Sequence, residues 1–139
     1  MKRMLSIVCA LAVASPAFAA TTWSSGISRG LTTYSVSTDG GKVQLVCDPD
    51  KVFGDVSNAS LKVDFGKPIS SSQIVVLSER GEQAPFTFDD SGFVLQADAN
   101  PESWDLMVGI IRTGGSYAFV TSQAALQLDG IAPIPDLDC

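Results

Sequence analysis

Apolar and polar positions alternate along much of the chain. In the segments 42–47 and 60–65 every second residue is apolar, which is the period of a half-buried β-strand. The unbroken apolar run at 73–78 predicts a central strand that is covered on both faces. Turn-forming glycine, proline, serine and aspartate residues separate these runs. The same criteria predict strands at 32–37, 42–47, 60–65, 73–78, 86–88, 93–95, 117–122 and 125–128.

Two of the intervening segments predict β-hairpins. Residues 38–41 are Thr-Asp-Gly-Gly, and residues 89–92 are Asp-Asp-Ser-Gly. Glycine and aspartate adopt the backbone angles of tight turns. We therefore expect the aromatic and aliphatic faces of 86–88 and 93–95 to pair across the second turn. Residues 48–59 are expected to form a loop.

The hydrophobic period changes after residue 100 and predicts one amphipathic helix over 101–113. Asn100 can cap its start, Pro101 suits its first turn, and Gly114-Gly115 can end it. The apolar residues that repeat at helical spacing are Trp104, Met107, Val108 and Ile111. We interpret Trp104 as a core residue in preference to a ligand platform. The predicted fold is mostly β: a small antiparallel β-sandwich or partly open barrel with one short α-helix near 101–113.

The amino terminus has the pattern of a bacterial signal peptide. Lys2 and Arg3 precede an apolar segment of about ten residues, which is too short to span a membrane. Small residues follow, so we expect cleavage after Ala19 or Ala20. The alternative, lipid attachment at Cys9, lacks a small residue before the cysteine. The sequence thus predicts a signal peptide at 1–19 and one periplasmic or secreted domain at 20–139, with no membrane anchor.

Charge excludes one class of partner. Removal of Lys2 and Arg3 leaves 7 basic and 15 acidic residues, a net charge of −8. Nucleic-acid binding depends on clustered lysine and arginine, and here the basic residues are scattered. We therefore expect no nucleic-acid partner.

Two cysteines remain in the exported domain, Cys47 and Cys139. An even pair in an oxidising compartment predicts a disulfide. Its contribution to stability would be about 4 kcal/mol from the entropy of the closed loop. Two free thiols or an intermolecular bridge are the alternatives.

The chain has no histidine, which excludes Ser-His-Asp and Cys-His catalysis and removes the commonest zinc ligand. Asp89 and Asp90 lie in a predicted exposed turn, where carboxylates are normally solvated and not tuned for proton transfer. Lys67 and the serines at 70–72 have no recognised nucleophile–base spacing. We expect no catalytic residues and no cofactor.

Asp48, Asp50 and Asp55 suggest a weak, irregular calcium site, because calcium binds clustered carboxylates. The EF-hand pattern fails, since Phe53 stands where glycine is needed and Ala59 where glutamate is needed. The calcium site is therefore only an alternative.

Several features occur in an order that resembles the periplasmic type VI secretion accessory family (TagO or VasI-like) and related small exported β proteins. The residues that carry the resemblance are Trp23, Gln44–Cys47, the helix around Trp104, Leu126–Ile131 and Leu137–Cys139. The resemblance implies a mid-chain cysteine paired with one at the end, and it transfers no catalytic residue. Pro133 and Pro135 depart from the helical ending that the family would imply.

Three functions are compatible with these observations. The leading hypothesis is a non-enzymatic periplasmic or secreted accessory or binding protein whose partner is another periplasmic or envelope protein. The first alternative is an inhibitor of a secreted hydrolase such as lysozyme, with Gly114, Gly115, Ser116 and Tyr117 as the contact loop. The second is a carboxylate-dependent cell-wall hydrolase. The sequence predicts no particular oligomeric state.

Overall fold

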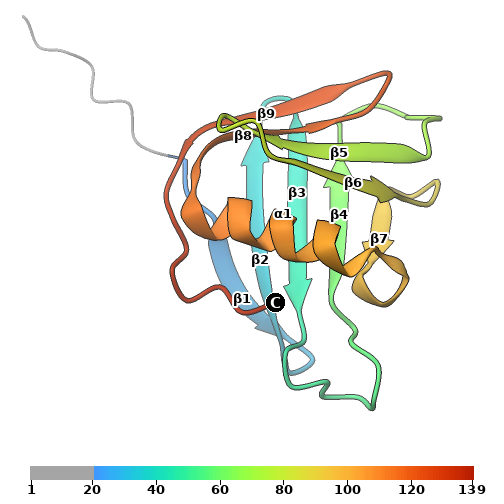
Figure 1. Cartoon of the computed structure of the whole chain (residues 1–139), viewed down its shortest axis with the longest axis vertical. Helices are drawn as coiled ribbons and strands as arrows, with labels where there is room; N and C mark the ends of the chain where they lie inside the picture. The colour runs from blue at the N-terminus through green and yellow to red at the C-terminus, as the bar shows by residue number, and fades with distance from the viewer. Residues whose placement is uncertain (1–20) are drawn as a thin grey trace, which may run out of the picture.

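The computed structural model describes residues 21–139, so the predicted signal peptide and Cys9 lie outside the described residues. The described chain forms two antiparallel sheets and one α-helix (Figure 1). The strands are β1 (Ser24–Ser28), β2 (Leu31–Thr38), β3 (Gly41–Cys47), β4 (Ser60–Asp64), β5 (Gln73–Ser78), β6 (Gln83–Thr87), β7 (Phe93–Leu95), β8 (Gly115–Val120) and β9 (Ala125–Ile131). A 3₁₀ turn, η1 (Gln96–Asp98), leads into α1 (Pro101–Thr113).

The larger sheet has the strand order β1-β2-β3-β4-β7. Its register places Val36 opposite Val43, and Leu45 between Tyr34 and Leu61. Side chains on one face of a strand lie two residues apart, so Val43 and Leu45 share the inner face, and both are fully buried. The pairing of β2 with β3 confirms the predicted hairpin over 38–41.

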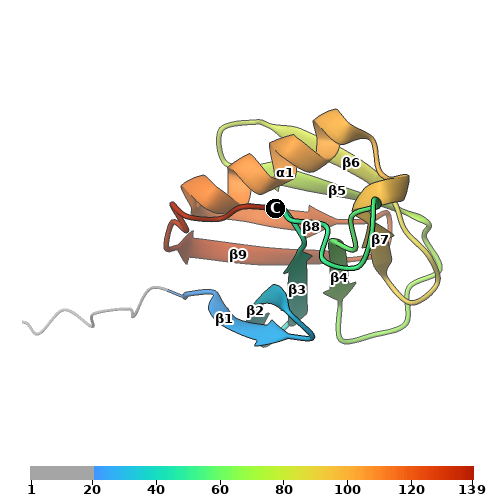
Figure 2. The same ribbon diagram turned by 90° about the horizontal axis from the view of Figure 1, so that it is seen from below.

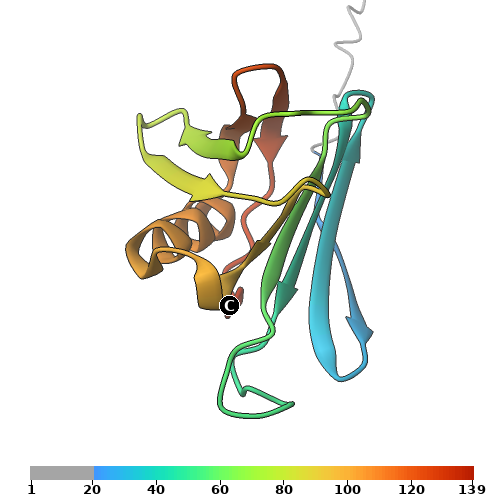
Figure 3. The ribbon, with the colours of Figure 1, turned by 90° about the vertical axis from the view of Figure 1, so that its right-hand side faces the viewer.

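The smaller sheet has the order β6-β5-β8-β9, and its strands cross those of the larger sheet (Figure 1). Viewed from the side, this sheet and α1 lie together against the same face of the larger sheet (Figure 3). The hydrophobic core lies between these layers. The prediction of a mostly β sandwich with one helix is confirmed, and the strands of residues 21–139 do not close into a barrel.

The helix begins and ends as its sequence predicts. Asn100 Oδ1 accepts hydrogen bonds from the backbone amides of Glu102, at 2.9 Å, and Ser103, at 3.2 Å. Gly114 caps the other end with a positive φ of 73°. Trp104 is 1% exposed and meets Phe86 edge to face at 6.3 Å between ring centroids, which confirms its interpretation as a core residue.

The predicted hairpin across residues 89–92 is wrong. A tight turn does form, because Asp89 Oδ1 accepts hydrogen bonds from the amides of Ser91 and Phe93. However, β6 belongs to the smaller sheet and β7 pairs with β4 of the larger one. The carbonyl of Gly92 accepts a hydrogen bond from the amide of Val63, which ties the turn to β4. The segment therefore carries the chain from one sheet to the other.

Two further strands differ from expectation. β5 lies inside its sheet, between β6 and β8, as predicted, but only one of its faces is fully covered. Ile74 and Val76 are buried, whereas Val75 and Leu77 on the other face are partly exposed. β1 was not predicted, because its sequence Ser-Ser-Gly-Ile-Ser has no apolar alternation and every residue is exposed.

Candidate binding surface

The outer face of the larger sheet has no covering layer within residues 21–139. Figure 3 shows the helix and the smaller sheet on the opposite side only. Outward-pointing side chains on β2 and β3, such as Thr33, Gln44 and Val46, are partly exposed, whereas the alternate positions on β3 are buried. The sandwich therefore presents one sheet face to solvent.

The loop between β3 and β4, residues 48–59, projects beyond the end of this sheet (Figure 1; Figure 3). It exposes three large apolar side chains: Val52 at 50%, Phe53 at 60% and Val56 at 63%. Large apolar side chains exposed close together in sequence on a loop are candidates for an interaction site.

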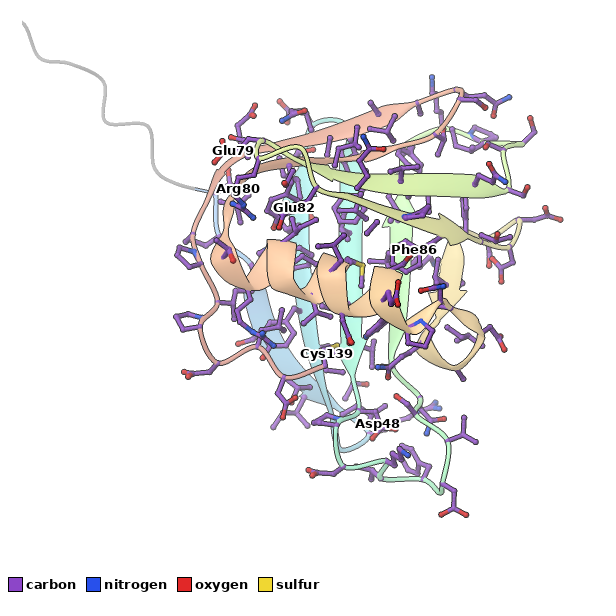
Figure 4. The ribbon with its side chains drawn as sticks, viewed as in Figure 1. Asp48, Glu79, Arg80, Glu82, Phe86 and Cys139 are labelled. Carbon is purple, nitrogen blue, oxygen red and sulfur yellow. A yellow bond between two sulfur atoms is a disulfide. The ribbon has the colours of Figure 1, made fainter. Side chains whose placement is uncertain are left out.

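Asp48 holds this loop in one conformation. It lies at the base of the loop (Figure 4), and its carboxylate accepts hydrogen bonds from the amides of Val52 and Asn58, both at 2.8 Å. The side-chain amide of Asn58 donates a third, at 3.0 Å. These bonds to the backbone amides of Val52 and Asn58, helped by the Asn58 side chain and by Lys51, lower the pKa of Asp48. The ionised carboxylate is thus the form that organises the loop.

The root of the loop is also fixed covalently. Cys47, the residue before Asp48, forms a disulfide with Cys139, as predicted. The carbonyl of Cys139 accepts hydrogen bonds from the indole of Trp104, at 3.0 Å, and from Gln96, at 3.2 Å. The loop therefore starts from a point that is tied to the carboxyl terminus and to the helix.

A groove of about 450 Å³ lies where the loop meets the outer face of the sheet. Its lining combines apolar side chains with amides, hydroxyls and one guanidinium: Ser28, Arg29, Leu31, Thr33, Gln44, Val46, Phe53 and Asn58. We call the groove together with the exposed side chains of Val52, Phe53 and Val56 the loop face. Apolar walls with a few polar groups are the usual composition of a recognition site.

The structure does not group the three candidate calcium ligands, Asp48, Asp50 and Asp55, as a calcium site would require. Asp48 is 3% exposed, and its oxygens already accept three hydrogen bonds from nitrogen donors. Asp50 and Asp55 are exposed on the loop. In the part of the chain that the structure describes, no three acidic or cysteine side chains are grouped to hold a metal ion. The Asp48 carboxylate therefore holds the loop backbone. A sequence pattern of acidic residues cannot distinguish this structural role from cation binding.

The candidate contact residues Gly114, Gly115, Ser116 and Tyr117 do not form an exposed loop. Gly114 caps the helix, and the other three begin β8. Tyr117 is buried, its hydroxyl accepts a hydrogen bond from the Trp23 indole at 2.7 Å, and burial raises its pKa to about 12. This segment is an ordinary helix-to-strand connection, and its Tyr117 side chain packs in the core.

The side chains that the sequence offers as candidates for catalysis also form hydrogen bonds that hold local structure. Asp89 Oδ1 accepts hydrogen bonds within its turn, first from the Ser91 hydroxyl, and these lower its pKa. A general acid needs the opposite shift. Lys67 donates to the carbonyl of Gln123, whose side chain bonds Ser70. The serine segment is therefore clamped to the β8–β9 turn.

The helix of residues 101–113 is too short to cross a membrane, and no other described segment forms a spanning helix.

The loop face itself was not predicted from the sequence. The sequence pattern marks Phe53 only as a mismatch to a calcium motif, and it places Asn58 only in a loop. The signal that could have identified the site is the adjacent pair Val52-Phe53 in a segment without strand or helix periodicity, because apolar residues in a loop have no core face to occupy.

Comparison with known proteins gives a family and no further relative. No curated protein and no solved structure matches the chain. The YfjT family matches residues 21–134, which is nearly all of the described chain. The protein therefore belongs to the YfjT family.

Proposed function

We propose that the protein is a non-enzymatic, exported binding protein that recognises another periplasmic or envelope protein through the loop face. The observation that carries the proposal is a projecting loop whose backbone is fixed by Asp48 and Cys47 while Phe53 and Val56 remain exposed. A loop that is already ordered loses little conformational entropy on binding, which favours affinity.

Export is supported by two observations. The disulfide between Cys47 and Cys139 suits an oxidising compartment. The amino-terminal sequence has the charge and hydrophobic pattern of a signal peptide. The resemblance to type VI secretion accessory proteins stays a prediction beside the family assignment, and it would place the partner in the cell envelope.

The proposal is tested by capturing partners with the oxidised chain in the periplasm of its own host, then measuring their affinity with purified proteins. We expect Phe53→Ser to weaken binding about thirtyfold, the effect of losing a central aromatic contact of about 2 kcal/mol. Phe93→Ser is the matched control, because Phe93 lies on the edge strand β7 and does not line the groove. Equal losses for both variants would contradict recognition through the loop face.

A specific observation also favours the alternative of a hydrolase inhibitor. An ordered loop with an apolar tip can enter the active-site cleft of an enzyme, and a domain with net charge −8 would meet a basic enzyme such as lysozyme rapidly. The inserting element would then be the loop at 48–59 and not the segment 114–117. A lysozyme assay decides this: inhibition at micromolar protein that Phe53→Ser abolishes would support the alternative, and unchanged turnover would reject it.

The remaining alternative, a carboxylate-dependent cell-wall hydrolase, receives no comparable support. Hydrogen bonds lower the pKa of Asp48, Glu82 and Asp89, whereas a general acid needs a raised pKa. Turnover of peptidoglycan by the purified chain would nevertheless support the hydrolase alternative.

A further inference from the structure

Among the residues that the structure describes, β1 differs from the other edge strands of the two sheets in having no protection against pairing. A free edge exposes backbone donors and acceptors, and proteins usually guard such edges with charge, proline, bulges or a covering element. Within residues 21–139, β6 contains Pro85 and packs against α1, β7 is only three residues long, and β9 carries Asp129 beside an irregular register with β8. β1 has a continuous register with β2, no charged residue and no proline.

The β1 strand is also already ordered in the single chain, before any second strand pairs with it. Just before β1, the carbonyl of Thr21 accepts a hydrogen bond from the amide of Ala132, and Trp23 donates to the buried hydroxyl of Tyr117. Both contacts anchor the start of the strand to the smaller sheet and to the chain that follows it. Figure 2 shows β1 as the outermost strand, away from α1. Its single large apolar side chain, Ile27, is 81% exposed.

We infer that the free edge of β1 pairs with β1 of a second copy of this chain, in antiparallel orientation, to form a dimer with one continuous ten-stranded sheet. The occupant is a second copy because its own β1 offers the same uncharged and unguarded edge. The domain has a net charge of −8, which repels a second copy over most of its surface, but Ser24–Ser28 contains no charge. When two copies of an uncharged strand pair, no like charges lie opposite each other in any register.

The dimer would align two loop faces. The two-fold axis of an antiparallel strand pair is perpendicular to the sheet, so the outer faces of both copies would lie on the same side. Ser28 and Leu31, at the turn between β1 and β2, line the groove of each copy close to this seam. The inference does not depend on the proposed function, because self-association is measured without any partner.

The test is sedimentation equilibrium of the oxidised mature chain from about 1 μM to about 1 mM, a range that brackets weak interfaces. We expect a monomer–dimer equilibrium that shifts toward the dimer as salt screens the repulsion. Ile27→Lys should weaken the dimer at least about tenfold, since a charge on an edge blocks strand pairing. Leu95→Lys, the same kind of change on the protected edge strand β7, should leave it unchanged.

A second measurement keeps the inference testable if Ile27→Lys does not fold. Hydrogen exchange of the wild-type chain should show slower exchange of β1 amides at high than at low protein concentration. Concentration-dependent protection confined to β1 would support the inference. A chain that stays monomeric throughout, a dimer that both lysine variants leave intact, or a β1 edge that becomes protected only when another protein binds would each overturn it.

Discussion

Asp48 shows how one side chain can organise a loop while other side chains of that loop remain exposed. Its two carboxylate oxygens accept hydrogen bonds from donors four and ten residues further along the chain, and so hold both arms of the loop at 48–59. Val52, Phe53 and Val56 on the same loop remain at least half exposed to solvent. The exposed residues recognise a partner in our account, and Asp48 only positions them.

The lowered pKa of Asp48 predicts how the loop responds to pH. Because the folded-state pKa lies below the unfolded value of 3.8, ionisation stabilises the loop fully above that value, and the stabilisation is lost as the pH falls through the folded pKa. We expect the amide resonances of Val52 and Asn58 to shift below about pH 4, as the acid protonates. In the Asp48→Asn variant, the resonances of these two amides should not change over the same pH range. Identical titrations in both proteins would show that another group organises the loop.

Gly41 is a position where only glycine fits, since its φ is 151° and a Cβ atom there would lie 2.0 Å from the carbonyl oxygen of Asp64. We predict that Gly41→Ala lowers the free energy of unfolding by on the order of 3 kcal/mol, measured by urea denaturation. Gly54→Ala is the matched control, because Gly54 has a similar φ of 139° with no atom within 4 Å. Equal losses in the two variants would mean that backbone strain dominates and that the close contact with β4 contributes nothing.

At the scale of elements, the carboxyl-terminal segment connects the layers of the sandwich. Arg112, at the end of α1, donates two hydrogen bonds to the carbonyl of Leu137, at 3.1 and 2.8 Å. Leu137 is buried, and Cys139 then joins β3 through the disulfide. The segment after β9 therefore links the helix, the core and the root of the loop at 48–59.

This linkage predicts the effect of removing the disulfide. The bond closes a loop of 92 residues in sequence separation, so the double variant Cys47→Ser with Cys139→Ser should lose about 4 kcal/mol of unfolding free energy in urea. Hydrogen exchange should quicken in residues 134–139 and at the root of the loop before it quickens in β5. If the sulfurs contribute little to stability, the variant and the oxidised wild type will have the same denaturation midpoint.

The elements that the sequence predicts correctly are those with local signals. Asn100, Pro101 and Gly114 mark both ends of α1, and the glycines at 40–41 mark the first hairpin. The segment after β6 carries an equally good turn signal, but the partner of β7 is decided by the contact of Gly92 with β4, which is remote in sequence. A turn signal predicts that the chain reverses and does not determine which strand the following residues join.

The candidate site was predictable to a smaller extent. The pairing of Cys47 with Cys139 followed from the cysteine count, because only two cysteines remain after the expected cleavage. The role of Asp48 did not, since clustered acids in a loop resemble cation ligands until the nitrogen donors around them are placed. The groove joins β1, β2, β3 and the loop, so it exists only in the folded chain.

At the scale of the whole molecule, the asymmetry of the sandwich is the central feature. One face of the larger sheet is covered by the smaller sheet and α1, and the other remains open with the loop at its end (Figure 3). Charged residues of both signs lie on or near the open side: Arg29 lines the groove, and Lys42 lies opposite Asp64 across β3 and β4. Our account assigns recognition to the end of this open side that carries the loop face.

The most direct test places a photoactivatable cross-linking residue at position 53 and, as a control, at position 105 on the exposed side of α1, and compares the adducts formed in the host periplasm. Our account predicts one reproducible protein adduct from position 53 that is absent from position 105, and a purified form of that protein should bind the wild-type chain more tightly than Phe53→Ser. Adducts from position 105 alone, or adducts equally distributed between the two positions, would contradict the assignment of recognition to the loop face.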